Sequence, residues 1–383
     1  MKNYCVLEGN VYIIEDEIYK LLENQHITPT KSELLKVKEL INNINKDIFS
    51  SPKLNEIAKK NNELYKIDVL PDILERMEKF IGNLGEEYIT SFYRNLETVK
   101  FEFDTPMKCD KILSRYTGGN YDPKTNVIHI NAHIIDQLRK IADEKDLYFS
   151  TMWNTVLAHE LFHLASCDNK LYNKTGYIYQ GLNKINFKKK FSNIEHLMAR
   201  ASISFDEGLT QLFACTIYRD EIGKDKFYFF NYGWRIHARI MSQLSLMIGQ
   251  DELGKAYFSH SGVQFIRNKL KQINKHKYLY NSIFFLLLSF YMADLADDDL
   301  ADKEKHTYEI RTQNILLQYE AKYIDSIDNE EEKKSFINSI RNFFVGYWKD
   351  TKNLNINEAA VSLMQQNLDI LNNLREKQKT YKK

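Results

Sequence analysis

The residues of this sequence that could carry chemistry are His159, Glu160 and His163, which form the pattern HExxH. Histidines at positions i and i+4 of a helix lie on the same face, so both imidazoles can bind one metal ion. Glu160 lies about 100° around the helix, where its carboxylate can flank the ion without displacing a ligand. It can take the proton from a zinc-bound water, whose pKa falls to about 7, and pass it to a leaving group. The pattern therefore predicts a catalytic zinc (Zn2+) site.

A catalytic zinc ion has three protein ligands and one open position. The metzincin pattern fails here, because it needs Gly at position 166 and His or Asp at position 169, where this chain has Ser166 and Asn169. We expect Glu207 as the third ligand, since it lies in a second helical pattern far enough downstream for the chain to turn back. Glu195 and Asp168 are the alternative third ligands. Asp168 follows the motif so closely that the chain has little room to turn back toward the histidines.

Asp206 and Gln211 flank the expected third ligand. Either could hold a ligand histidine in its metal-binding tautomer, and either could equally be an ordinary helix-start or surface residue. A hydrolase of this kind also needs a donor for the oxyanion of its tetrahedral intermediate. Tyr232 is the first choice for this donor, followed by His237 and Tyr228.

Two further histidines, His129 and His133, precede the motif. We interpret them as structural or cleft-lining residues and not as ligands, because they fall on alternate positions of a strand pattern.

The segments that must position these residues are mostly helical. Two short strand patterns interrupt the helices, at 99–103 and 126–131, with turn-rich residues 118–123 between them. The chain is therefore predicted to be α+β and predominantly helical, with a small sheet before the motif helix. The predicted helices are Ser32–Asn45, Leu54–Tyr65, Pro71–Asn83, the motif helix Thr151–Ser166 and most of the chain from Glu195 onward, including a last helix Asn357–Lys379.

Composition argues against several other classes of protein. The 53 Lys and Arg residues nearly balance the 52 Asp and Glu residues, so no strong field favours nucleic acid or an anionic membrane. The 4 cysteines form no CxxC pair, which indicates reduced thiols and argues against a thiolate zinc site. The N-terminus lacks a signal-peptide core, and the longest apolar run, 283–292, is too short to span a membrane. We expect a cytoplasmic protein without a nucleic-acid or membrane partner.

The segments HELFH (159–163) and FDEGLTQLF (205–213) together resemble the gluzincin group of zinc metallopeptidases, whose third ligand is a Glu on a second helix. They are most similar to zincin-like proteins of low-GC bacteria, which share pieces like 121–130 and 175–180. The resemblance covers roughly residues 100–260. It implies a zincin core with a cleft between a sheet-bearing lobe and a helical lobe. It also implies that Val127–Asn131 is an edge strand that pairs with an extended peptide. Gln211 departs from the pattern, since a second Glu is common there.

The sequence therefore predicts a zinc-dependent hydrolase, a peptidase acting on a peptide or protein substrate. Its zincin-like core would span 96–260, between helical segments 1–95 and 261–383. A further possibility is a hydrolase that acts on a non-peptide amide, or a toxin directed at one target protein. The alternative from another class is a partner-binding protein that keeps a structural zinc ion on the same scaffold. Glu160 argues against that alternative, because a structural site has no use for an unligated carboxylate. The sequence predicts no oligomeric state.

Overall fold

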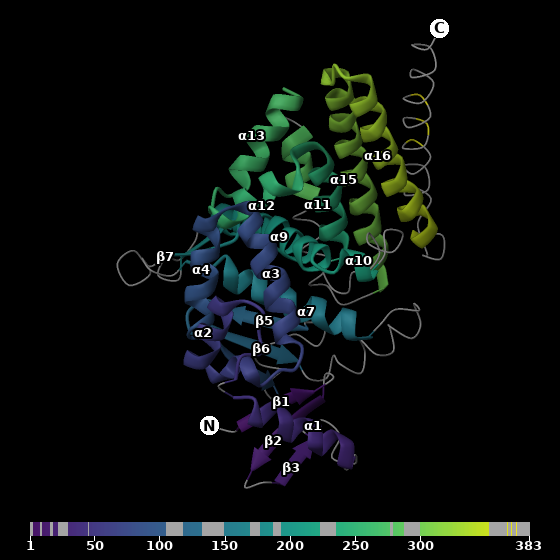
Figure 1. The fold of residues 1–383 in the computed structure, drawn as a ribbon. Helices are drawn as coiled ribbons and strands as arrows, with labels where there is room; N and C mark the ends of the chain where they lie inside the picture. The colour runs from purple at the N-terminus through teal and green to yellow at the C-terminus, as the bar shows by residue number, and fades with distance from the viewer. Residues whose placement is uncertain are drawn as a thin grey trace. The chain divides into compact units, whose positions relative to one another are not determined.

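The structure of this chain is a computed structural model (Figure 1). It describes residues 3–7, 10–15, 18–21, 30–44, 46–104, 118–131, 149–168, 177–186, 193–222, 235–275, 279–286 and 299–351, together with positions 366, 369 and 373. Most of these residues are helical, so the prediction of a predominantly helical α+β chain is confirmed. The chain divides into two compact units, residues 1–180, 185–187 and 213–222 on one hand and 181–184, 188–212 and 223–383 on the other.

The first unit begins with an antiparallel sheet of β1 (Asn3–Leu7), β2 (Asn10–Glu15) and β3 (Ile18–Leu21), in the order β1-β2-β3. This sheet differs from the helical segment predicted for 1–95. The strands are rich in β-branched and aromatic residues, and segments of two residues connect them, which is hairpin spacing. The strands and the segments between them are too short to show the repeat of apolar residues that marks a helix.

Helices follow this sheet. They are α1 (Lys31–Asn42), α2 (Pro52–Lys60), the short 3-10 helix η1 (Asn62–Tyr65), α3 (Leu70–Leu84) and α4 (Glu86–Leu96). The three helices predicted for this region are confirmed, with the second divided into α2 and η1. The Ser51 hydroxyl caps α2 by accepting from the Leu54 N–H at 3.4 Å.

A second sheet consists of β4 (Lys100–Asp104), β6 (Val127–Asn131) and β5 (Gly119–Asp122), in the order β4-β6-β5. Strand β6 runs parallel to β4 and antiparallel to β5. Two of the three strands match the predicted ones. The predicted turn at 118–123 is instead mostly strand β5, and the tight turn follows it, closed by a hydrogen bond from the Asn126 N–H to the Asp122 carbonyl at 2.9 Å.

Because β6 pairs on both sides, it is the central strand of this sheet. The prediction that Val127–Asn131 forms an edge strand is therefore wrong, and among the described strands β5 lies at one edge of this sheet. The Asn131 N–H donates to the Gly118 carbonyl at 3.0 Å, which makes Gly119 and Ile130 a non-hydrogen-bonded pair. The N–H and C=O of Gly119 consequently point away from β6.

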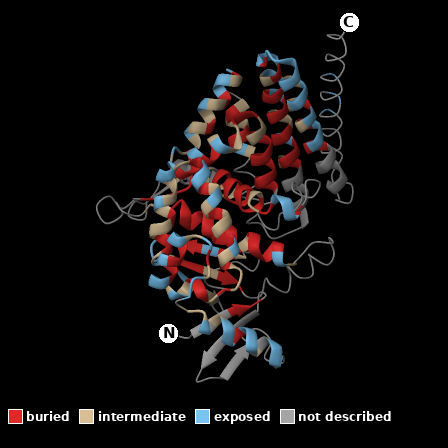
Figure 2. Ribbon diagram, in the orientation of Figure 1, coloured by how far each residue is buried: buried red, intermediate tan, exposed pale blue. Residues whose placement is uncertain are grey.

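Helix α7 (Phe149–Ala165) carries the HExxH motif and is buried over nearly all its length (Figure 2). It packs against α3, α4 and β5. A helix that is apolar all round suits such a position, and the motif histidines face the interior as predicted. The buried Asn95 amide of α4 closes the helix end by donating to the carbonyls of Leu164 at 2.7 Å and Cys167 at 2.8 Å.

The chain then forms strands β7 (Tyr177–Gln180) and β8 (Asn183–Asn186), which pair as a hairpin. The long helix α9 (Asn193–Thr216) carries Glu207, and the short α10 (Arg219–Ile222) follows it.

The second unit is helical, as predicted for the C-terminal part of the chain. Helix α11 (Arg235–Ile248) packs against α12 (Gln250–Phe258), α15 (Asp299–Ser326) and α16 (Glu330–Thr351), and α13 (Val263–Ile273) packs against α15. A further helical segment spans 279–286. None of the helices that the structure describes has the length and apolar character needed to cross a membrane. The predicted helix Asn357–Lys379 lies almost entirely outside the described residues.

Candidate metal centre

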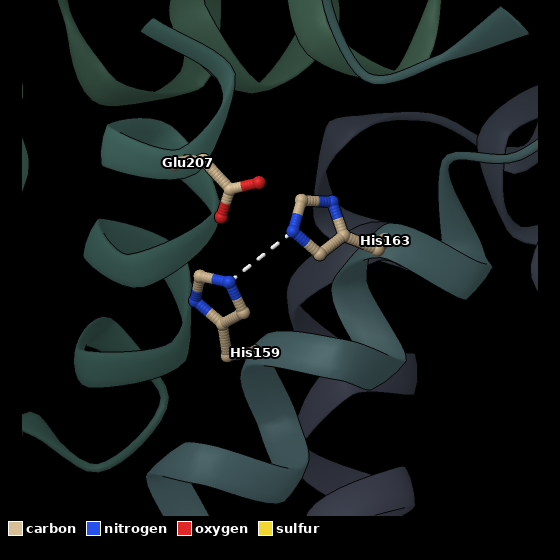
Figure 3. A group of neighbouring side chains, drawn as sticks. All are labelled: His159, His163 and Glu207. Carbon is tan, nitrogen blue, oxygen red and sulfur yellow. Dashed lines mark hydrogen bonds between the residues drawn. The ribbon is translucent and has the colours of Figure 1, made fainter. Parts of the chain in front are cut away.

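Helix α7 presents the imidazoles of His159 and His163 side by side (Figure 3). Their Nε2 atoms lie 3.2 Å apart, and the side chains are 5% and 4% exposed. Two nitrogens that bind one tetrahedral zinc ion at the usual bond lengths are about 3.3 Å apart. The two imidazoles therefore already have the separation that a shared zinc ion requires.

Glu207 of α9 directs its carboxylate toward the two imidazoles (Figure 3). The ligand atoms of His159, His163 and Glu207 all lie within 4.8 Å of one another, and no other such group of His, Cys, Asp or Glu occurs among the described residues. The structure thus brings together the three predicted ligands, which form the donor set N, N, O.

An aromatic contact holds the C-terminal part of α9 against the motif helix. Phe213 of α9 packs on Phe162 of α7, with ring centroids 5.9 Å apart, and on Phe80 of α3 at 5.2 Å. Phe162 immediately precedes His163. Glu207 lies less than two helical turns before Phe213, about 9 Å along the axis. Because α9 is one continuous helix, this packing restricts where the Glu207 carboxylate can lie.

Gly208, the residue after the expected ligand, faces helix α11. A Cβ atom at this position would lie 2.8 Å from both the His237 carbonyl oxygen and the Met241 Cγ. The α11 backbone cannot yield as a flexible side chain could, so the close packing of α9 on α11 requires glycine here. This contact gives a physical reason for the Glu-Gly pair of the sequence.

Glu160, the predicted general base, is 6% exposed and lies against the edge strand β5. A Cβ atom on Gly119 would lie 2.8 Å from the Glu160 Cγ and 3.1 Å from its Oε1. Gly119 therefore belongs to the surroundings of the base. Its residue type suggested only a turn, and a contact so distant along the chain leaves no signal in the local pattern.

Of the two alternative ligands, Asp168 has a described side chain. Asp168 pairs with Tyr179 through two backbone hydrogen bonds, and its carboxylate lies 3.7 Å from the Arg94 guanidinium. Glu195 belongs to α9, but its side chain lies outside what the structure describes. His129 of β6 lies 3.8 Å from the carboxylate of Glu102, its partner on β4, and its interpretation as a structural or cleft-lining residue stays a prediction.

Asp206, the residue before Glu207, forms a hydrogen bond with the β7–β8 turn. Its Oδ1 accepts a hydrogen bond of 2.7 Å from the Leu182 N–H in the β7–β8 turn. Gln211 lies one turn further along α9 and is buried. The suggestion that either residue orients a ligand histidine stays a prediction.

The candidates for the oxyanion donor are only partly described. His237 lies in α11 and is 1% exposed. Tyr228 and Tyr232 lie outside the described residues, as does His133. The assignment of Tyr232 or His237 to this role stays a prediction.

Two of the cysteines follow the motif, on or beside the elements that carry the expected ligands. Cys167, just after α7, and Cys215 of α9 are buried thiols without a disulfide. Burial raises the pKa of the Cys167 thiol to about 11, and its hydrogen bond with Tyr121 only partly opposes this shift. Since metals bind the thiolate form, the histidine and carboxylate set fits zinc better than any set that includes Cys167.

Comparisons with protein families, with characterised proteins and with solved structures found no match to this chain. The resemblance to gluzincins consequently rests on the motif residues alone, and the chemistry must be argued from the geometry of the site.

Proposed function

We propose that this protein is a zinc-dependent hydrolase that cleaves peptide bonds. The observation that carries the proposal is the 3.2 Å separation of the His159 and His163 Nε2 atoms, with the Glu207 carboxylate beside them. Two imidazole nitrogens and one carboxylate make up a typical ligand set of catalytic zinc, which keeps its fourth position for water or substrate.

A zinc ion bound by these residues would supply a Lewis acid that acidifies water and polarises the scissile carbonyl. Glu160 would accept the proton of the attacking water and donate it to the leaving nitrogen. Its carboxylate suits this role, because it is nearly buried and its stem is confined by the strand carrying Gly119. Tyr232 or His237 would then donate a hydrogen bond to the oxyanion, as proposed from the sequence.

Strand β5 suggests how a peptide would bind. The N–H and C=O of Gly119 point away from β6, and no other described strand pairs with β5 on that side. An extended peptide that adds to this edge would form main-chain hydrogen bonds, which tolerate many side chains. Because Gly119 contacts Glu160, such a peptide would pass beside the general base. We propose that β5 fulfils the role expected of Val127–Asn131.

The reducing environment predicted from the cysteines fits the buried thiols of Cys167 and Cys215. We therefore propose a cytoplasmic peptide or protein as the substrate.

Cleavage of a peptide library by the purified, zinc-loaded chain, followed by mass spectrometry, tests this function. We expect chelator-sensitive cleavage by the wild type and a loss of about 10²–10⁴-fold in Glu160→Gln, with bound zinc retained. The matched control is Glu102→Gln, a partly exposed glutamate of the same sheet, which should cleave normally. Full activity of Glu160→Gln would contradict the proposal.

A further inference from the structure

The β7–β8 hairpin (177–186) begins beside the end of the motif helix. Within this hairpin, Tyr179 exchanges two backbone hydrogen bonds with Asp168, from the Asp168 N–H at 2.7 Å and from the Tyr179 N–H at 3.1 Å. Asp168 follows Cys167, whose carbonyl accepts from the Asn95 amide that closes α7. The first strand of the hairpin is therefore attached to the histidine-bearing helix through main-chain bonds.

The turn of the same hairpin is attached to the helix that carries Glu207. The Leu182 N–H donates to the Asp206 Oδ1 at 2.7 Å, and both residues are buried. Gly181 adopts a left-handed conformation with φ +52°. A Cβ atom there would lie 1.9 Å from the Asp206 Oδ1 and 2.5 Å from the Tyr257 Cε2. Glycine is required both by its backbone angle and by the closeness of Asp206.

The covalent chain limits the distance between these two attachments. Tyr179 and Leu182 are three residues apart, so their Cα atoms can be separated by at most about 11 Å. One attachment follows the histidines in sequence, and the other immediately precedes Glu207. The chain between the two attachments is thus only the four residues 179–182.

We infer that the β7–β8 hairpin is a strap that sets the position of Glu207 relative to His159 and His163, with Asp206 as its positioning residue. This inference rests on the proposed metal centre and assigns Asp206 a role through the hairpin. Groups that orient ligands without binding the metal commonly contribute 10–100-fold to metal affinity.

Zinc affinity, measured by competition with a chromogenic chelator, tests the strap without any need for catalysis. We expect Asp206→Ala to weaken zinc binding by about 10–100-fold. Asp206→Asn keeps an oxygen that accepts from the Leu182 N–H, so it should restore affinity to within a few-fold of the wild type. Gly181→Ala breaks the same attachment from the hairpin side and should weaken binding as Asp206→Ala does.

The matched control is Tyr257→Phe. It removes the 2.8 Å hydrogen bond between the Tyr257 hydroxyl and the Thr210 hydroxyl, one turn beyond Asp206 on α9. This buried bond is comparable to the one lost in Asp206→Ala, but it does not involve the hairpin backbone. We expect Tyr257→Phe to lower stability and to leave zinc affinity unchanged.

The outcomes separate the strap from the proposed function. Equal weakening of zinc binding in Asp206→Ala and Tyr257→Phe would overturn the strap, because it would show a general loss of stability. Unchanged affinity in both Asp206→Ala and Gly181→Ala would overturn it as well. Failure of the wild type to bind zinc would instead contradict the metal centre itself.

Discussion

Gly119 lies so close to Glu160 that a Cβ atom on the glycine would come within 2.8 Å of the glutamate Cγ. One residue belongs to the edge of a sheet, where an extended peptide can pair, and the other is the proposed general base. The contact would thus relate the proposed binding of a peptide to the position of the proposed base.

Gly119→Ala should displace the Glu160 carboxylate while leaving the zinc ligands in place. The added methyl group requires a shift of several tenths of an ångström, and small misplacements of a catalytic group can lower the rate by up to about 100-fold. We expect kcat to fall by about 10–100-fold with zinc content unchanged. Steady-state kinetics beside metal analysis checks this, and Asn120→Ala, at the exposed neighbouring position, is the control. An unchanged kcat in Gly119→Ala would refute the assigned contact.

Gly208→Ala should destabilise the protein, although alanine is normally the better helix former by about 1 kcal/mol. The methyl group would collide with the His237 carbonyl of α11, and overpacking of this kind costs about 1–3 kcal/mol. Urea denaturation measures the change. Gly82→Ala in α3 is the matched control, because its Cβ would meet nothing closer than Ile89 Cδ1 at 3.7 Å. We expect that substitution to be neutral or stabilising, and similar effects at both glycines would contradict the close approach of α11.

The buried Glu320 of α15 predicts a pH dependence of stability that is unrelated to the metal. Burial raises its pKa from 4.5 to about 8, opposed in part by a hydrogen bond from the Gln243 amide. Between these values the folded state holds a proton that the unfolded state has released. The free energy of unfolding should therefore decrease as pH rises through this window, on the order of 1.4 kcal/mol per pH unit.

Denaturation of wild type and Glu320→Gln between pH 5 and pH 9 checks this prediction. The difference in stability between the two proteins should shift in favour of the glutamine variant as pH rises. Asp325→Asn, which alters an exposed carboxylate of the same helix, should follow the wild type. A difference that stays constant over this range would show that Glu320 titrates normally.

The local sequence pattern predicted the parts of the site that lie on one helix. His159, Glu160 and His163 follow from the HExxH pattern within a helical segment, and their burial agrees with the apolar residues around them. Glu207 required the further assumption that a second helix returns to the first. The structure places its carboxylate within 4.8 Å of the histidine nitrogens, and Phe213 further along the same helix packs on Phe162 of the motif helix.

Contacts between elements that are distant in sequence could not be predicted from the local sequence pattern. Gly119 was assigned only to a predicted turn, and the need for glycine at position 208 was not predicted, because the atoms that require glycine belong to elements distant in sequence. The same holds for Asn95, whose amide closes α7 from another helix. The N-terminal sheet was missed because its strands are too short to outweigh the helical composition of the first 95 residues.

The most direct test of the proposed metal centre is the zinc content of the purified chain, measured by inductively coupled plasma mass spectrometry. We expect about one zinc ion per chain in the wild type and in Glu160→Gln, and strongly reduced content in His163→Ala and Glu207→Ala. A wild type that binds no metal, or a His163→Ala variant that retains a full complement, would contradict it.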